Sequence, residues 1–547
     1  MIVRIIAGVI GAALIVLSII GARKSKRRIL SVIGVAFLIF AVLSWVIPTS
    51  TYTSGKLSTK NIDPVGLVQI INSPISALIT FALYGAVFAA IGGLYGVMDK
   101  TKALEKITNN AVKSFKGKEN TFLVIALVLF VLLSSLTGLI LPLFVFVPLF
   151  AYILLAMGYE KVTALAATVG GLLVGSIGST LGFNITGYTK NLLSLDMTNQ
   201  IVARIIILIL LTVLFALTLV FTSKKSSKKV EVKKEEVKKE IKKVEVKKTS
   251  PKKEVKKTVS KTKSSSKSKA AKTTKAKTTK KSNTKGLAVT KPVKKVSEKS
   301  GVSGKGLIII LILMFVFAFV GMYNWYYSFG IDVFNKMHES VMGFEVGGYK
   351  IFASLLSGFT QFGYWSNVEL IGLIVLTSLI IGLVYKLKFN DLIESFIAGM
   401  KEWMPTAIYA TLANVVLVVL YQALQGGAGT LVDTINGSLF SMVDGFNPII
   451  TGVAAFIGSF FFNDLYYLLA NMQAYVSSFG GTDTSIAGLL IQSVYGVSMM
   501  VFPTSVVLIA GLSIFDVSYG KWMKFIWRFA LIAFLLVLLT AGLLTLV

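Results

Sequence analysis

The chain has 547 residues, of which 54% are hydrophobic and 15% are charged, and it contains no Cys and a single His. Soluble domains average about 25% charged residues, so this composition excludes an ordinary soluble globular protein. The lack of Cys excludes disulfides and thiolate metal sites, and one His excludes a His-based metal site. We therefore predict a membrane protein that is not an enzyme and has no cofactor beyond a coupling ion.

The N-terminal segment MIVRIIAGVIGAALIVLSIIGARKSKRR has an apolar run, then basic residues and no small-residue cleavage site. This pattern predicts an uncleaved anchor helix and a basic loop over residues 1–28. Apolar runs of about the 20 residues needed to cross the hydrocarbon core recur along the chain. They predict about ten spans, at roughly 3–21, 29–47, 75–97, 164–186, 201–222, 306–322, 368–386, 404–424, 485–512 and 522–546. The expected fold is an all-α, multi-pass protein of the cell membrane.

Two further apolar stretches, 121–157 and 449–476, are too long for one span and have polar residues or Gly near their centres. We interpret both as re-entrant hairpins, whose irregular tips are tolerated at membrane depth only inside protein or facing water. A long tilted helix or two short spans is the alternative for each. Short loops rich in Lys normally lie in the cytoplasm. All the Lys-rich loops of this chain lie on one side of the membrane only if each of the two stretches enters and leaves the membrane on the same side. That arrangement places residues 223–305 in the cytoplasm and both termini outside.

The predicted elements repeat in the same order. Two spans, a hairpin and two spans make up residues 29–222, and the same order returns in residues 368–547. Between them lie a basic linker (223–305) and a connecting span with an external loop (306–367). Because a single span connects the two copies, the second copy starts on the opposite side of the membrane and has the inverted orientation. Inverted repeats are typical of secondary transporters whose binding site lies near the bilayer midplane.

The span after each hairpin is predicted to be broken. The first, AATVGGLLVGSIGSTLGFNITGY, has five Gly between residues 170 and 182, and the second, LLIQSVYGVSMMVFPTSVVL, contains a Pro beside small polar residues. Unwound backbone and hydroxyls suit a cation such as Na⁺, and half-helix N-termini suit an anionic group. Close helix packing through small residues is the alternative.

The stretches IGGLYGVMDKTKALEKI (91–107), GSIGSTLGFNITG (175–187), VFPTSVVLIAGL (501–512) and SYGKWMKF (518–525) resemble the C4-dicarboxylate anaerobic carrier family, in particular its YfcC-like branch within the ion transporter superfamily. The resemblance implies an elevator-type symporter or antiporter for small carboxylates or amino acids, often a homodimer, driven by Na⁺, H⁺ or exchange. The chain departs from the family at its second hairpin tip, usually rich in Ser and Gly, and at STLGFN, where an Asn-Pro pair is usual. The candidate substrate or ion-binding residues are Ser134, Ser135, Thr137, Gly138, Gly178, Ser179, Thr180, Asn184, Asn463, Asp464, Gly496, Ser498, Pro503, Thr504 and Ser505.

Asp464 lies in the apolar stretch FFFNDLYYLLANM, where an ionised group costs at least about 2.5–3.5 kcal/mol. One hypothesis places it beside the substrate, where it pairs with a cationic group of an amino acid, binds Na⁺ or carries a proton. The alternative is that it caps a half-helix beginning at Leu465. Arg204 and Arg528 lie near span ends, and we expect them to extend to the membrane surface; binding of substrate is the alternative.

Most of the net charge of +31 comes from residues 223–300, which have almost no large apolar or aromatic side chains. Such a segment is predicted to be disordered. It suits contact with anionic lipid or a role as a solvated spacer, and we favour both over nucleic-acid binding. The alternative to transport is a diverged, non-transporting membrane scaffold whose basic segment binds anionic lipid or nucleic acid.

Overall fold

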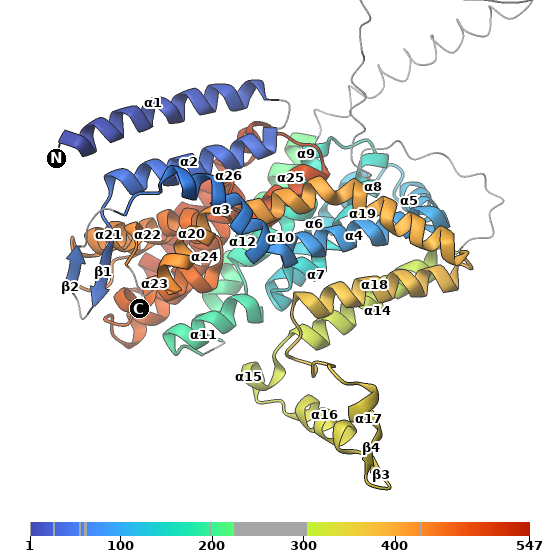
Figure 1. Cartoon of the computed structure of the whole chain (residues 1–547). Coiled ribbons are helices and arrows are strands. Elements are labelled where there is room, and N and C mark those ends of the chain that lie inside the picture. Colours follow the sequence, from blue (N-terminus) through green and yellow to red (C-terminus); the bar gives the residue numbers. More distant parts are fainter. Residues whose placement is uncertain are drawn as a thin grey trace, which may run out of the picture.

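The computed structural model describes residues 2–25, 28–53, 56–59, 63–196, 198–223, 303–425 and 429–546. The basic segment predicted over 223–300 therefore lies outside the described residues, apart from Ser223. Within the described part, the chain is all-α and multi-pass, as predicted, with two short two-stranded antiparallel sheets. Figure 1 shows the helices gathered into one bundle.

The first half of the chain forms the following helices and strands. They are α1 (Ile2–Lys24), α2 (Arg28–Val46), β1 (Ser50–Thr53), β2 (Lys56–Thr59), α3 (Leu67–Thr80), α4 (Ala82–Thr101), α5 (Ala103–Ser114), α6 (Glu119–Thr137), α7 (Ile140–Phe144), α8 (Val147–Ala156), α9 (Lys161–Leu165), the π-helix η1 (Ala166–Gly170), α10 (Gly171–Ile177), the π-helix η2 (Phe183–Gly187), α11 (Tyr188–Leu193) and α12 (Ile201–Ser223).

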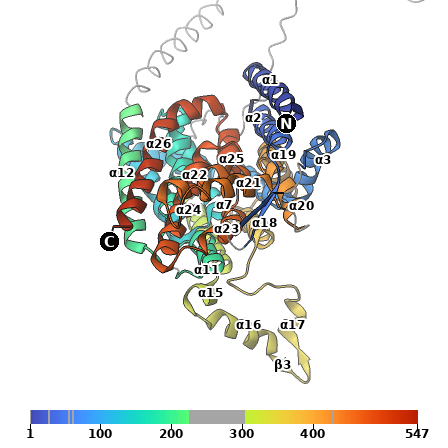
Figure 2. The same ribbon diagram turned by 90° about the vertical axis from the view of Figure 1, so that its left-hand side faces the viewer.

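The second half begins after the basic segment. Its elements are α14 (Gly304–Met322), α15 (Trp325–Phe329), α16 (Val333–Gly343), β3 (Glu345–Val346), β4 (Tyr349–Lys350), α17 (Ile351–Leu355), α18 (Asn367–Val384), α19 (Phe389–Leu412), α20 (Val415–Gln425), α21 (Leu431–Phe440), α22 (Pro448–Phe461), α23 (Leu465–Val476), α24 (Gly481–Val501), α25 (Val506–Ile514) and α26 (Tyr519–Leu544). In Figures 1 and 2 the elements from α15 to α17 project away from the bundle.

The number of spans is lower than the predicted ten. By length and apolar composition, eight stretches of the described residues suffice to cross a membrane, or nine if the bent pair α19–α20 is one span. The predicted span 164–186 is divided by an interruption at residues 178–182, which leaves pieces that are too short. The N-terminal helix adds only the apolar stretch Gly8–Ala22. In contrast, α6, predicted as one arm of a hairpin, is itself of spanning length.

The chain turns back on itself at both predicted hairpins. In the first, Phe150 of α8 contacts both Phe122 and Phe130 of α6, with ring centroids 5.9 Å and 5.3 Å apart. The two arms therefore lie side by side, joined at Gly138. In the second, α22 and α23 contact each other across a break of three residues. The α6–α8 and α22–α23 hairpins are each followed by an interrupted helix, α9–α11 and α24–α25.

The two halves meet along α4 and α19. Gly85 of α4 faces Thr411, and Gly96 faces Gly399, so the residue numbers fall on one helix as they rise on the other and the helices run antiparallel. These two helices lie side by side in Figure 1. Small residues at this seam let the backbones approach closely, as is common between helices in membranes. Deeper in the bundle, α10 packs against α6 and α24, which brings the interrupted helices of the two halves together.

Candidate functional site

The second interrupted helix breaks at a proline. Helix α24 ends at Val501, and Phe502 is extended with φ −77° and ψ 139°. Pro503 follows, and a proline disfavours helical geometry in the residue before it and has no N–H to donate. Helix α25 then begins after Ser505, whose Oγ accepts a hydrogen bond from the backbone N–H of Leu508 at 3.3 Å. The sequence FPTS therefore leaves four residues unwound inside the bundle.

The tip of the second hairpin is fixed to this break. Asn463 Nδ2 donates to the backbone carbonyl of Thr504 at 2.7 Å and to Asn414 Oδ1 at 3.0 Å. The hydroxyl of Tyr495, on α24, donates to the Asn463 carbonyl at 2.9 Å. Asp464 Oδ1 accepts from the backbone N–H of Tyr466 at 2.9 Å, so Asp464 caps α23. The predicted capping role of Asp464 is thus present in the structure.

Two oxygen atoms at this junction have no hydrogen-bond partner among the described residues. Asn463 Oδ1 and Thr504 Oγ1 are both buried, and no donor or acceptor in the described part of the chain reaches them. Buried polar atoms are nearly always paired, because leaving one unpaired costs about 1–3 kcal/mol. Unpaired oxygens that lie at a break between two half-helices are therefore candidates to contact a bound group.

The first hairpin tip contacts the first interrupted helix in a closed arrangement. Ser135 Oγ donates to the Gly178 carbonyl at 2.9 Å and lies 3.2 Å from Thr180 Oγ1. Gly138 has φ +67°, a conformation that suits glycine, and its backbone contacts Gly182 so closely that a Cβ on Gly182 would lie 2.8 Å from it. Ser179 Oγ donates to the Ser135 carbonyl at 3.3 Å. The polar groups predicted at this tip therefore bond mainly to one another.

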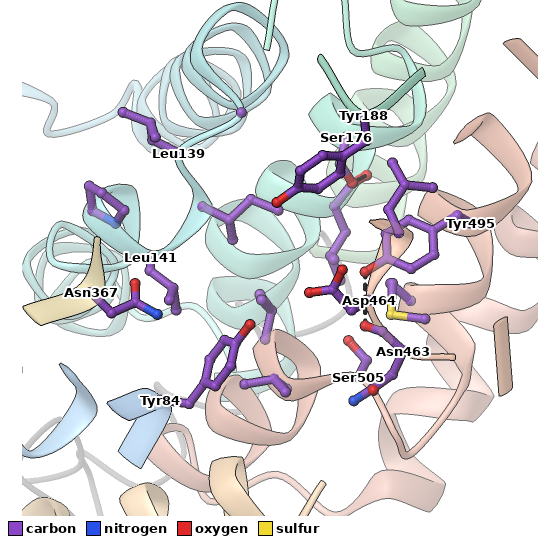
Figure 3. A pocket seen from close by; sticks show the side chains of 18 of the residues that line it. Tyr84, Leu139, Leu141, Ser176, Tyr188, Asn367, Asn463, Asp464, Tyr495 and Ser505 are labelled. Atoms are coloured by element: carbon purple, nitrogen blue, oxygen red, sulfur yellow. Dashed lines mark hydrogen bonds between the residues drawn. The ribbon is translucent and has the colours of Figure 1, made fainter. Parts of the chain in front are cut away.

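A cavity of about 350 Å³ opens where these elements meet. The first hairpin tip contributes residues 138–142, the second tip residues 463–465, and the second break residues 505–507. Ser176 and Tyr188 come from the first interrupted helix (Figure 3). Four of the residues predicted from the sequence line the cavity: Gly138, Asn463, Asp464 and Ser505. The cavity thus draws on both hairpins and both interrupted helices.

The other predicted residues lie outside the cavity lining. Several of their hydroxyls bond within the helix bundle: Ser134 to the Leu172 carbonyl, Thr137 to the Leu133 carbonyl, and Ser498 to the Val494 carbonyl. Gly496 packs against the backbone of Ile177, which matches the packing alternative. Gly178, Ser179, Thr180, Pro503 and Thr504 shape the two breaks. The side chain of Asn184 lies outside the part of the structure that is described.

Several cavity residues were not predicted. Tyr84 of α4, Tyr188 of α11 and Tyr495 of α24 surround Asp464 in Figure 3. Asn414 sits in the bend between α19 and α20, and Trp365 comes from the segment before α18. Asn414 carried a usable signal, because an amide in the middle of a predicted span, 404–424, marks a buried or functional position. The tyrosines carried none, since aromatic residues are frequent throughout this chain.

The electrostatics of the cavity are unusual for a site that binds anions. Among the described residues that line it, none is Lys, Arg or His, and the one acidic residue is Asp464. Within the described part, no hydrogen bond or salt bridge reaches Asp464 Oδ2, and the carboxylate points into the cavity in Figure 3. The N-termini of α23 and α25 begin at the cavity, and such ends carry partial positive charge. No group of three or more metal-binding side chains occurs among the described residues.

The sequence profile of the C4-dicarboxylate anaerobic carrier family matches residues 27–263 and 266–547. The chain belongs to this family. A search of curated proteins returns no match. Among solved structures, the chain is similar to the Alcanivorax borkumensis YdaH transporter, at 13% identity over 94% of this chain and 97% of that one, with a TM-score of 0.30. A superposition this weak adds nothing to the family assignment.

Membership in the C4-dicarboxylate anaerobic carrier family agrees with the resemblance of the four sequence stretches. The profile covers both halves of the chain and omits residues 1–26, which make up most of the anchor helix and basic loop predicted over residues 1–28. The family assignment and the all-α, multi-pass fold thus agree.

Proposed function

We propose that the protein is a secondary active transporter of the elevator type that carries small carboxylates or amino acids across the cell membrane. One observation carries this proposal: both hairpin tips and both interrupted helices contribute to a single cavity of about 350 Å³. Ligand sites between interrupted helices are typical of secondary transporters, because half-helix ends and unwound backbone supply charge and hydrogen bonds at membrane depth.

The lining of the cavity favours an amino acid over a dicarboxylate. A dicarboxylate carries two negative charges and would meet Asp464 and, among the described lining residues, no Lys, Arg or His. An amino acid has one carboxylate, which suits the N-terminal end of α25, and one ammonium group, which suits Asp464 Oδ2. Tyr84, Tyr188 and Tyr495 line the same cavity, and aromatic rings near a cation attract it.

The unpaired oxygens give the substrate or a coupling ion a place to bind. Asn463 lines the cavity, and its Oδ1 is able to accept from a substrate ammonium group or to coordinate Na⁺. Thr504 lies outside the lining, so its Oγ1 is able to coordinate an ion that enters the break. Within this proposal, the hairpins and interrupted helices move as a transport part against a scaffold that includes the α4–α19 seam. A homodimer, and coupling to Na⁺, H⁺ or a counter-substrate, belong to the same proposal.

The test is uptake by the purified full-length chain in proteoliposomes. Radiolabelled amino acids and dicarboxylates are supplied in turn, with an inward Na⁺ gradient, an inward proton gradient or unlabelled counter-substrate inside. We expect uptake of amino acids and little uptake of dicarboxylates. Uptake of dicarboxylates alone would keep the transporter and refute the amino-acid assignment. No uptake by correctly folded protein would favour the non-transporting scaffold.

A further inference from the structure

The side chain of Arg204 is buried, and no described residue supplies a counter-charge to it. It lies in the first turn of α12 and is 0% exposed, so the expectation that it extends to the membrane surface is wrong. Among the described residues, no carboxylate lies within salt-bridge distance of it. A buried charge is costly unless it is paired or held by several hydrogen bonds, so the surroundings of Arg204 need to supply them.

Those hydrogen bonds come from the first interrupted helix and its neighbours. Arg204 Nε donates to the Asn199 carbonyl at 2.7 Å, and Nη1 donates to the Ser179 carbonyl at 3.0 Å. Nη1 also donates to Gln492 Oε1 on α24, while Gln492 Nε2 donates to the Ser176 carbonyl at 3.4 Å and lies 3.5 Å from that of Ile177. The guanidinium therefore lies at the C-terminal end of α10, where the helix dipole is negative.

Three other backbone carbonyls of the first break accept hydrogen bonds from side chains of the described chain. Ser135 Oγ donates to the Gly178 carbonyl, the hydroxyl of Tyr323 donates to the Leu181 carbonyl at 2.5 Å, and Thr186 donates to the Gly182 carbonyl. At the second break, too, chain donors reach the carbonyls of Met500, Val501 and Thr504. The two breaks differ in which buried atoms lack a partner in the described part of the chain: a donor, Arg204 Nη2, at the first, and two oxygens, Asn463 Oδ1 and Thr504 Oγ1, beside the second. The two halves, alike in the order of their elements, are unlike in how their breaks are filled.

We propose that Arg204 is a built-in cation that takes the place of a coupling ion at the first break, so that any coupling cation is confined to the second break. Arg stays protonated in proteins, so this positive charge is permanent. A free cation bound to the same carbonyls would be repelled by the guanidinium beside it. This inference assigns the position of a coupling ion and rests on the proposed transport function, but its test does not require transport.

The test measures the thermal stability of the purified full-length protein in detergent. The variants Arg204→Lys and Arg204→Gln keep a polar side chain, but only the lysine keeps the charge. We expect both to lower Tm, and Arg204→Gln to lower it by several degrees more than Arg204→Lys. The control is Arg528→Ala, since Arg528 is exposed and lies over the ring of Trp527. It should leave Tm unchanged. Equal stability of the lysine and glutamine variants would overturn the proposal.

Two further measurements of Tm use added guanidinium and added Na⁺. Millimolar guanidinium should raise the Tm of Arg204→Ala above its value at the same ionic strength of KCl and leave wild type unchanged, because the free ion fills the vacated site. Absence of this rescue in a folded variant would count against a charge requirement at the site. An Na⁺-specific stabilisation that is lost in Arg204→Gln and kept in Asn463→Ala would place the coupling ion at the first break and overturn the inference.

Discussion

Replacing Asp464 by asparagine separates its two roles. Asp464 Oδ1 accepts from the Tyr466 N–H at 2.9 Å, and the amide oxygen of asparagine is able to accept the same bond. Asn and Asp are nearly equal as helix caps, so Asp464→Asn should leave folding intact and remove only the negative charge. Asp464→Ala removes the cap as well and should cost about 1 kcal/mol of stability.

The expected loss of transport follows from the charge. An ammonium group 4 Å from the carboxylate gains about 4 kcal/mol at an effective dielectric constant near 20. Loss of hydration of both groups offsets part of this gain. A net loss of about 2.7 kcal/mol corresponds to roughly a hundredfold fall in kcat/KM, because each 1.36 kcal/mol is a factor of ten.

Initial rates of amino-acid uptake into proteoliposomes measure this fall, and Tm in detergent measures stability. The control is Asp516→Asn, because Asp516 is an acidic side chain that is 72% exposed and pairs only at the surface with Lys161. Surface ion pairs contribute roughly 0–1 kcal/mol, so this variant should transport normally. A wild-type uptake rate in Asp464→Asn would refute the assignment of Asp464 to the substrate cavity.

Three further predictions concern the remaining parts of the site. Asn463→Ala should abolish uptake and lower Tm, because it removes the bonds to Thr504 and Asn414; uptake at the wild-type rate would exclude Asn463 from the site. Gly496→Val should destabilise the protein by about 1–3 kcal/mol, since an added Cβ would lie 2.8 Å from the backbone of Ile177, and an unchanged Tm would contradict this packing. Replacing residues 224–302 with a short neutral linker should leave uptake unchanged, because every residue lining the cavity lies elsewhere; total loss of uptake in folded protein would show that the segment is required.

The sequence allowed the interruptions of the helices to be predicted because their causes are local. Pro503 ends α24 wherever that helix packs, and the glycine-rich stretch from 170 to 182 has a low intrinsic preference for helix. The hairpins were predictable for a related reason, since polar residues at the centre of an overlong apolar run require a turn inside protein. Asp464 followed from the same pattern, both as a helix cap and as a residue that lines the cavity.

Positions that depend on contacts between distant segments were not predictable. Arg204 stands at the start of an apolar span, where a basic residue usually extends to the membrane surface. Its burial depends on Ser179, 25 residues earlier, and on Gln492, 288 residues later. Tyr84 and Tyr188 enter the cavity from helices on either side of the first hairpin. No local pattern distinguishes such residues from core aromatics, since their role arises only when the two halves pack.

The contrast between the two breaks has a consequence for energy coupling. A cation bound about 4 Å from the Arg204 guanidinium would be destabilised by about 4 kcal/mol at an effective dielectric constant near 20, which weakens its binding about a thousandfold. The same cation at the second break would meet two unpaired oxygens, with the carboxylate of Asp464 on the adjoining cavity wall. An ion and a substrate ammonium would then compete for one negative region. That competition favours exchange of one amino acid for another over symport with Na⁺, and it predicts that Na⁺ lowers amino-acid uptake in a way that excess substrate relieves.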